Sequence, residues 1–176
     1  GAVVEVIKYL VQLGHTKFAL IGGLKEQLHM VDRAKGFRDA LLARDLKVYP
    51  NLIKFGDYQI DSGYRLMLEL LEEDPRPTAI ICGNDLMAAG AIKAIHDKGY
   101  KIPSDFSVVG FDDSEISKVV DPPLTTIKAP TFEMGNLAVE KLCSMIQQKD
   151  MELEEIAILP CELIIRSSTG ECNQKN

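Results

Sequence analysis

The chain has 176 residues and a formal charge of −6, and 46% of its residues are hydrophobic while 26% are charged. This composition is typical of a globular protein with room for one domain or two small lobes. The basic residues are scattered, which argues against nucleic-acid binding by this segment, because phosphate contacts need clustered Lys and Arg. The sequence shows neither a secretory signal nor an apolar stretch near the roughly 20 residues that span a membrane, so we expect no membrane contact.

The four cysteines argue against a metal centre and against a redox site. None of them forms a C-x-x-C pair, and none has a histidine at the spacing of zinc ligands. Cys82 and Cys143 lie in apolar sequence and are expected to be reduced core residues, which suits a cytoplasmic protein. We therefore expect no metal and no cofactor.

Strand-length apolar runs alternate with helix-length amphipathic segments from the start of the chain. Each run is apolar on both faces, as expected of a buried parallel strand. The runs cover residues 18–21, 52–55, 79–82 and 108–109, and the amphipathic segments between them cover residues 33–43, 62–71 and 86–95. Repeated β-α units of this kind predict an α/β fold with a doubly wound parallel sheet and right-handed crossovers.

The punctuation of the helices agrees with this arrangement. Asp61 or Ser62 is expected to cap the helix that covers residues 62–71, and Asp85 the next one. Gly99 follows as a stop signal.

The pattern changes after Asp112. Asp121-Pro122-Pro123 cannot continue a helix, and an extended segment follows at residues 124–128. A long amphipathic helix is then predicted from about 132 to 148, before the chain returns through apolar runs at 156–159 and 162–165. The polar residues 170–176 are expected to form a flexible tail.

Polar and aromatic side chains follow the predicted strands, at the edge where ligands bind in open α/β sheets. Tyr58 follows the second strand, Asn84 the third and Asp112 the fourth, while Arg33 starts the helix after the first strand. A guanidinium, an amide, a carboxylate and a ring suit a neutral polyol, because charged and amide groups meet adjacent hydroxyls and the ring stacks on the apolar sugar face. We predict that these four residues bind a small polar effector, a sugar.

Each of these residues also has an alternative interpretation. Tyr58 could be a half-buried packing residue, Asn84 a turn residue, and Arg33 the surface partner of Asp32 or Glu26. The sequence has no nucleophile elbow, zinc-protease motif, dinucleotide fingerprint or P-loop, and its three histidines are isolated, so we expect no enzyme activity. The pair Asp112-Asp113 could suggest Mg²⁺ or a phosphoryl acceptor, but no lysine follows in a position to support either role.

The same residues carry a resemblance to a known family. Over roughly residues 3–169 the chain is similar to the effector-binding core of LacI/GalR-type bacterial transcription regulators. The most specific match joins Val108-Val109-Gly110-Phe111-Asp112-Asp113 to Pro122-Pro123-Leu124-Thr125-Thr126-Ile127. Further matching text lies at residues 13–15, 32–37, 56–58, 62–64, 77–80, 84–90, 102–105 and 163–169.

The resemblance implies a periplasmic-binding-protein-like fold and a role for each predicted site residue. In this family, and in the similar periplasmic sugar-binding proteins, the positions matching Arg33, Asn84 and Asp112 hydrogen-bond the effector, and the position matching Tyr58 stacks on it. All four positions carry suitable residues in this chain, which favours a sugar over a purine as the effector. The residue after Lys128 is often a glutamine that can reach the ligand, but here it is Ala129, which puts one polar contact in doubt.

The resemblance also implies a division of the chain. Residues 1–125 would form the main part of the C-terminal lobe, 126–150 a remnant of the N-terminal lobe, 151–169 a return to the C-terminal lobe, and 170–176 the flexible tail. We expect an effector-sensing fragment of a homodimeric regulator, lacking half of the first lobe and the N-terminal helix-turn-helix domain through which alone the regulator contacts operator DNA. The alternatives are a periplasmic sugar-binding protein of a transporter and an interaction module for a phosphocarrier protein.

Overall fold

Six strands form a mostly parallel sheet in the part of the chain that the computed structural model describes, residues 1–146 and 157–173. Their spatial order is β2-β1-β3-β4-β5-β6, and neighbouring strands are parallel except for β5 and β6, which are antiparallel. The strands are β1 (Phe18–Gly22), β2 (Ile53–Phe55), β3 (Ala79–Cys82), β4 (Ser107–Phe111), β5 (Thr125–Lys128) and β6 (Glu162–Ile164).

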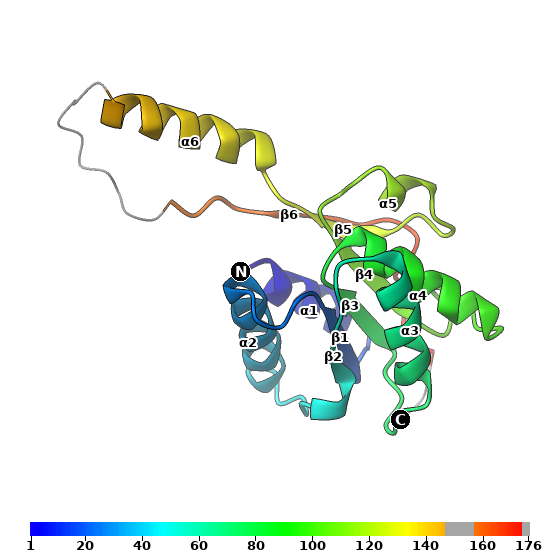
Figure 1. Cartoon of the computed structure of the whole chain (residues 1–176). Helices are drawn as coiled ribbons and strands as arrows, with labels where there is room; N and C mark the ends of the chain where they lie inside the picture. Colours follow the sequence, from blue (N-terminus) through cyan, green and yellow to red (C-terminus); the bar gives the residue numbers. More distant parts are fainter. Residues whose placement is uncertain (147–156, 174–176) are drawn as a thin grey trace.

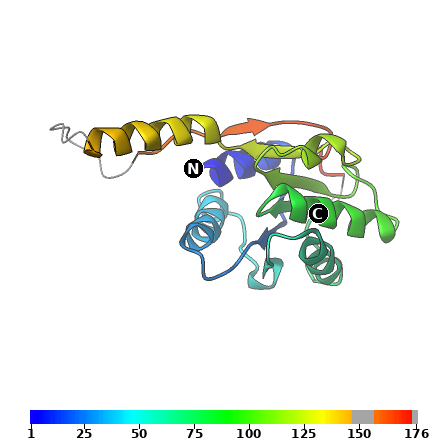
Figure 2. The same cartoon turned by 45° about the horizontal axis from the view of Figure 1, so that its top comes forward.

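Helices cover both faces of this sheet (Figures 1 and 2). Helices α1 (Ala2–Gln12) and α2 (Leu28–Leu42) lie on one face, and α3 (Ile60–Leu71) and α4 (Asp85–Asp97) on the other. All residues of β1 are buried, and successive residues serve opposite faces: Phe18 and Leu20 pack with α1 and α2, whereas Ala19 and Ile21 pack with α3 and α4. A strand buried on both sides is apolar throughout. The predicted doubly wound parallel sheet is therefore confirmed.

Helices α3 and α4 pack closely because glycines lie where they meet. A Cβ atom at Gly63 would lie 2.1 Å from the carbonyl oxygen of Met87, and one at Gly90 would lie 2.0 Å from that of Ile60. No larger residue fits at either position with the backbone in place. The contacts involve the first turns of both helices, so the loops after β2 and β3 are held next to each other.

The predicted helix caps need correction. Asn84, and not Asp85, caps α4, because its Oδ1 accepts a hydrogen bond from the backbone N–H of Met87 at 2.9 Å. Asp85 is the first helical residue, and its carboxylate binds other partners instead of a cap. Gln59 stands at the N-cap of α3 without a side-chain bond, so the assignment to Asp61 or Ser62 is wrong. Gly99 follows α4 with φ of +78°, as its role as a stop signal predicts.

Helix α6 (Thr131–Ile146) projects away from the sheet (Figure 1), and none of its described residues is buried. Cys143 is accordingly exposed, which corrects its assignment to the core, whereas Cys82 in β3 is buried as predicted. The amphipathic pattern of α6 indicates that the helix has an apolar side, but it does not indicate which surface packs against that side. Residues 147 and 148, the predicted end of this helix, lie outside the described part of the chain. None of the described helices combines the length and the apolarity needed to cross a bilayer.

The ends of the predicted segments differ in detail from the structure. The predicted lobe boundary after residue 125 falls inside β5, which pairs with β4 as far as Ile127. Residues 170–173 contact the body of the protein: the N–H of Gly170 donates to Ser107 Oγ at 3.1 Å, and the N–H of Cys172 donates to the carbonyl oxygen of Leu13 at 2.8 Å. The part of the expected tail that the structure describes is thus anchored. The division into two lobes stays a prediction.

Candidate functional site

The loops after β2, β3 and β4 meet at the carboxyl edge of the sheet, beside the N-terminal half of α2, which begins at Leu28 and not at Arg33 as predicted. They carry Tyr58, Asn84 and Asp112, and α2 carries Arg33. The chain runs from β1 outward to β2 and then back across to β3, which is the reversal of strand order where open α/β sheets form a ligand crevice. The structure thus brings the four predicted residues to one region.

The guanidinium of Arg33 contacts the ends of two strands. Its Nη1 donates a hydrogen bond to the carbonyl oxygen of Gly83 at 2.7 Å, and its Cζ lies 3.8 Å from the centroid of the Phe111 ring. Burial lowers the pKa of Arg33, and the nearby groups of Tyr58 and Asp112 partly offset this effect. These contacts replace the alternative surface pairing of Arg33 with Asp32 or Glu26. A stacked guanidinium keeps further N–H groups available for a ligand.

The ring of Tyr58 is fixed from several sides. Tyr58 has a left-handed backbone with φ of +67°, and its ring fills the space above Gly23, where an added Cβ would lie 1.8 Å from Tyr58 Cζ. The hydroxyl donates to Gln27 Oε1 at 2.9 Å and lies 2.8 Å from His29 Nε2. Because the hydroxyl has one proton and gives it to Gln27, His29 Nε2 must carry a proton and donate to the hydroxyl oxygen.

Asn84 links two of the loops at this edge. Its Oδ1 accepts the capping bond of α4, and its Nδ2 donates to the carbonyl oxygen of Tyr58 at 3.0 Å. An amide has two N–H donors and two acceptor lone pairs, so this pattern leaves hydrogen-bonding capacity for a ligand. Asn84 is therefore a structural residue in addition to any binding role.

Asp112 stands at the rim beyond β4, where it is exposed to solvent. It has φ of +109°, and its N–H donates to the carbonyl oxygen of Ile127 in β5 at 2.8 Å. Partial enclosure of the carboxyl raises the pKa of Asp112, the negative charge of Asp85 raises it further, and Arg33 opposes both. The carboxylate is thus held near one negative and one positive group.

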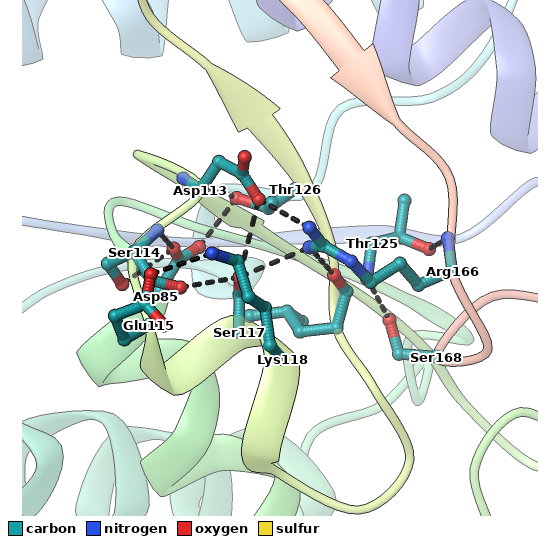
Figure 3. A network of polar contacts seen from close by, with 11 residues as sticks. Asp85, Asp113, Ser114, Glu115, Ser117, Lys118, Thr125, Thr126, Arg166 and Ser168 are labelled. Carbon is teal, nitrogen blue, oxygen red and sulfur yellow. Dashed lines mark hydrogen bonds and ion pairs between the residues drawn. The ribbon is translucent and has the colours of Figure 1, made fainter.

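Several residues at this edge have roles that were not predicted from the sequence. Phe111 supports Arg33, and Gln27 and His29 hold Tyr58. Asp85 and Arg166 anchor the loop that follows Asp112 through the polar network in Figure 3. Their sequence signals are weak: Asp85 reads as a cap, and Arg166 lies far along the chain from its partners.

Two hollows border this edge. One, of about 280 Å³, is lined by Arg33, His29 and Phe111 together with the first residues of α1. The other, of about 590 Å³, lies between α6 and residues 157–161 and is bordered by Phe111, Ala129 and Met134. Phe111 borders both hollows. Among the described residues, no group of three His, Cys, Asp or Glu side chains is arranged to hold a metal ion.

Comparison with known proteins identifies the family. The family model of periplasmic binding protein-like domains matches residues 7–169. The HTH-type transcriptional repressor PurR of Histophilus somni strain 129Pt is 41% identical over 161 residues, which are 92% of this chain and 48% of that protein. PurR of Aliivibrio fischeri strain ES114 is 39% identical over 165 residues, covering 93% of this chain and 49% of that protein. The chain thus spans about half the length of the curated relatives it matches.

Solved structures agree with this assignment. The lac repressor dimer bound to operator and the anti-inducer ONPF superposes with a TM-score of 0.88 at 33% identity, covering 96% of this chain and 57% of that one. The complex of the transcriptional regulator CelR with cellobiose has a TM-score of 0.85 at 33% identity, with coverages of 92% and 49%. A LacI-family regulatory protein from Chloroflexus aggregans has a TM-score of 0.88 at 31% identity, with coverages of 96% and 60%.

Fold and neighbours together define the class, an effector-binding domain of the type found in transcription regulators. The chain belongs to the periplasmic binding protein-like domain family. Its resemblance to LacI/GalR-type regulators, expected from the sequence, is confirmed.

Proposed function

We propose that this chain senses a sugar for a DNA-binding transcriptional regulator, and that Arg33, Tyr58, Asn84 and Asp112 form one wall of the sugar site. The observation that carries the proposal is the convergence of a cation, an aromatic ring, an amide and a carboxylate at one edge of the sheet. The whole regulator would be a homodimer in the cytoplasm, and effector binding would change its affinity for operator DNA.

The chemistry of the site fits a neutral ring that carries hydroxyl groups. The planar guanidinium of Arg33 presents several N–H donors, and the carboxylate of Asp112 accepts hydrogen bonds, so the two can share adjacent hydroxyls. Their opposite charges balance, which suits an uncharged ligand. The ring of Tyr58 offers an apolar face for stacking. A purine base could stack in the same way, so it is the alternative ligand class.

Calorimetry of the full-length protein tests the ligand class. We expect one or more of glucose, galactose, ribose and cellobiose to bind, and adenine, guanine and hypoxanthine not to bind. Binding of a purine base without any sugar would contradict the sugar proposal, and the absence of binding by all seven compounds would contradict both classes.

Variants test the assignment of the residues. Arg33→Ala and Asp112→Ala each remove a group that has several hydrogen bonds to offer, so we expect the Kd for the sugar to rise at least about tenfold, or about 1.4 kcal/mol. Lys35→Ala is the matched control, because Lys35 lies on the same helix but pairs with Asp39 at the surface. Equal Kd values for all three variants would rule out this wall as the binding site.

The similarity to transcription repressors favours regulation over the alternatives of sugar transport and binding to a phosphocarrier protein. An electrophoretic mobility shift assay with the full-length protein and its own promoter DNA distinguishes them. We expect the bound fraction to change when the sugar is added. If the protein bound no DNA either with or without sugar, its proposed function as a DNA-binding regulator would be excluded.

A further inference from the structure

The loop that follows Asp112 is anchored by two residues that lie outside the proposed sugar site. We propose that Asp85 and Arg166 are positioning residues that hold Asp112 in its ligand-binding orientation, acting through residues 113–117, the loop that leads into the short helix α5 (Ile116–Val119) and the first turn of that helix. This inference rests on the proposed function, which it deepens. Figure 3 shows Asp85 and Arg166 with the residues after Asp112 that they contact, Asp113, Ser114 and Ser117.

The backbone at Asp112 needs support from its surroundings. Asp112 and Asp113 are consecutive non-glycine residues with φ of +109° and +54°. Each left-handed residue costs of order 1–3 kcal/mol and persists only where neighbouring contacts enforce it. One such contact is the bond from the Asp112 N–H to β5, but this bond alone leaves the following residues free to relax.

Asp85 provides the first anchor. Only 1% of this residue is exposed, and its carboxylate accepts three hydrogen bonds: from the N–H of Ser114 at 2.7 Å, from Ser114 Oγ at 2.9 Å and from Thr126 Oγ1 at 2.6 Å. The carboxylate passes over Gly110 in β4, where an added Cβ would lie 2.3 Å from Asp85 Oδ1. Asp85 therefore ties the loop to α4 and to β5.

Arg166 provides the second anchor, from the segment that follows β6. Its Nη2 forms an ion pair with Asp113 Oδ1, and its Nη1 donates to the carbonyl oxygen of Leu124 at 2.8 Å and to Ser117 Oγ at 3.1 Å. The side chains of Arg166 and Asp113 are 19% and 15% exposed, so water screens this pair less than the exposed pairs of the protein. The fork of the guanidinium is needed to reach three acceptors at once.

The two anchors hold both sides of the loop. Asp85 binds Ser114, and Arg166 binds Asp113 and Ser117, so the residues directly after Asp112 cannot move without breaking partly buried bonds. Asp85 binds Thr126 in β5, the strand that leads to α6, and Arg166 directly follows β6, the strand that pairs with β5. The orientation of Asp112 is thereby linked to the strands that leave the body of the protein.

The test uses Arg166→Lys and Arg166→Gln in the full-length protein without ligand. The pKa of Asp112 is measured from the pH dependence of its carboxyl ¹³C NMR signal. Loss of positioning exposes the partly enclosed carboxyl further and lowers this pKa, because the partial burial of the carboxyl is the main cause of the upward shift. Loss of positive charge alone, in Arg166→Gln, would raise it instead. We expect the pKa to fall in both variants.

Matched variants separate positioning from general loss of stability. Thr126→Val removes the hydroxyl that donates to Asp85 and accepts from the N–H of Asp113, so it should act like the Arg166 variants, whereas Thr126→Ser retains the hydroxyl and should leave the Asp112 signal unchanged. Lys118→Gln breaks the exposed pair with Glu115 and removes no hydrogen bond to Asp85 or Arg166, so it should leave the pKa of Asp112 unchanged. If neither Arg166 variant folds, the comparison of Thr126→Val with Thr126→Ser still tests whether these contacts position Asp112.

Calorimetry with glucose, galactose, ribose and cellobiose gives the functional readout. We expect Arg166→Lys and Thr126→Val to weaken binding of the sugar that binds the unaltered protein by about tenfold. The positioning role would be overturned if sugar affinity stayed unchanged and the pKa of Asp112 either did not fall in the Arg166 variants or did not change in Thr126→Val. This outcome would leave the proposed function intact. If none of the four sugars binds the unaltered protein, the proposed function fails, while the NMR comparison still decides whether the anchors hold Asp112.

Discussion

The ring of Tyr58 occupies the space where a side chain at position 23 would stand. In Gly23→Ala the new Cβ would meet Tyr58 Cζ at 1.8 Å, so the ring must swing away from Gln27 and His29. We expect the Kd for the sugar to rise about tenfold and the free energy of unfolding to fall by about 1–3 kcal/mol. Calorimetry and thermal denaturation measure the two effects.

Gly36→Ala is the control for this prediction. Gly36 lies within α2, and nothing stands within 4 Å of the Cβ that alanine would add. Because glycine is a poor helix former, alanine should raise the free energy of unfolding by about 0.5–1 kcal/mol and leave sugar affinity unchanged. Similar affinities for the Gly23 and Gly36 variants would show that the orientation of the Tyr58 ring is not needed for binding.

The raised pKa of Asp112 has a consequence for stability. A carboxyl with a higher pKa in the folded state than in the unfolded chain holds its proton more tightly when folded. Stability therefore decreases as the pH rises from the ordinary range of Asp through the raised value. Asp112→Asn removes this loss, so we expect the ligand-free variant to be slightly more stable at pH 7. The gain should be small because Asp112 is exposed and screened by solvent.

Thermal denaturation of both proteins between pH 3.5 and pH 7 checks this prediction. The difference in Tm between Asp112→Asn and the unaltered protein should grow with pH and then level off. The difference isolates Asp112 from carboxylates such as Asp97, whose pKa is lowered by its bonds to Lys93 and Tyr64. A difference that does not depend on pH would mean that Asp112 titrates alike in the folded and unfolded states.

At the scale of elements, the contact between α3 and α4 sets the spacing of the loops that carry Tyr58 and Asn84. Gly90→Ala places a Cβ 2.0 Å from the carbonyl oxygen of Ile60, and backbone cannot yield as a flexible side chain can. We expect a loss of about 1–3 kcal/mol in the free energy of unfolding, or more. Urea denaturation measures it, with Gly36→Ala as the comparison. A variant as stable as the unaltered protein would show that the helices can separate at little cost.

The sequence is informative about these elements because each is determined locally. Strands such as β1 are apolar on both faces, and the end of each parallel strand meets the same edge, so the sequence pattern alone places Tyr58, Asn84 and Asp112 together. The pattern misassigns Asp85 because its partners Ser114 and Thr126 lie 29 and 41 residues away. Such bonds follow from packing in three dimensions, which local patterns do not encode.

Arg166 and α6 show the same limit. The ion pair of Arg166 with Asp113 joins residues 53 positions apart, and the matching text that contains each residue does not reveal that the two pair. The periodicity of α6 correctly predicts a helix with an apolar side, but burial also needs a partner surface. The expected burial of Cys143 therefore fails, because α6 does not reach the core in the described part of the chain.

At the scale of the whole molecule, the sheet and its four packed helices form a body with two buried cores, and α6 stands apart from it (Figure 2). The segments on either side of α6 pass through β5 and β6, next to the loop that carries Asp112. A partner that moves α6 would therefore act on the strands that Asp85 and Arg166 connect to the candidate site.

The apolar stripe on α6 leads to a last prediction. Phe132, Val139, Leu142 and Ile146 recur at helical spacing, and their exposed fractions lie between 57% and 75%. Monomeric proteins rarely expose a contiguous patch of this kind, because association or aggregation removes it from water. We expect the 176-residue polypeptide to self-associate through α6. Sedimentation velocity should show Leu142→Lys combined with Ile146→Lys as a monomer and Glu140→Gln, on the same helix, as unchanged. A monomeric unaltered chain at tens of micromolar would mean that this stripe is tolerated in water.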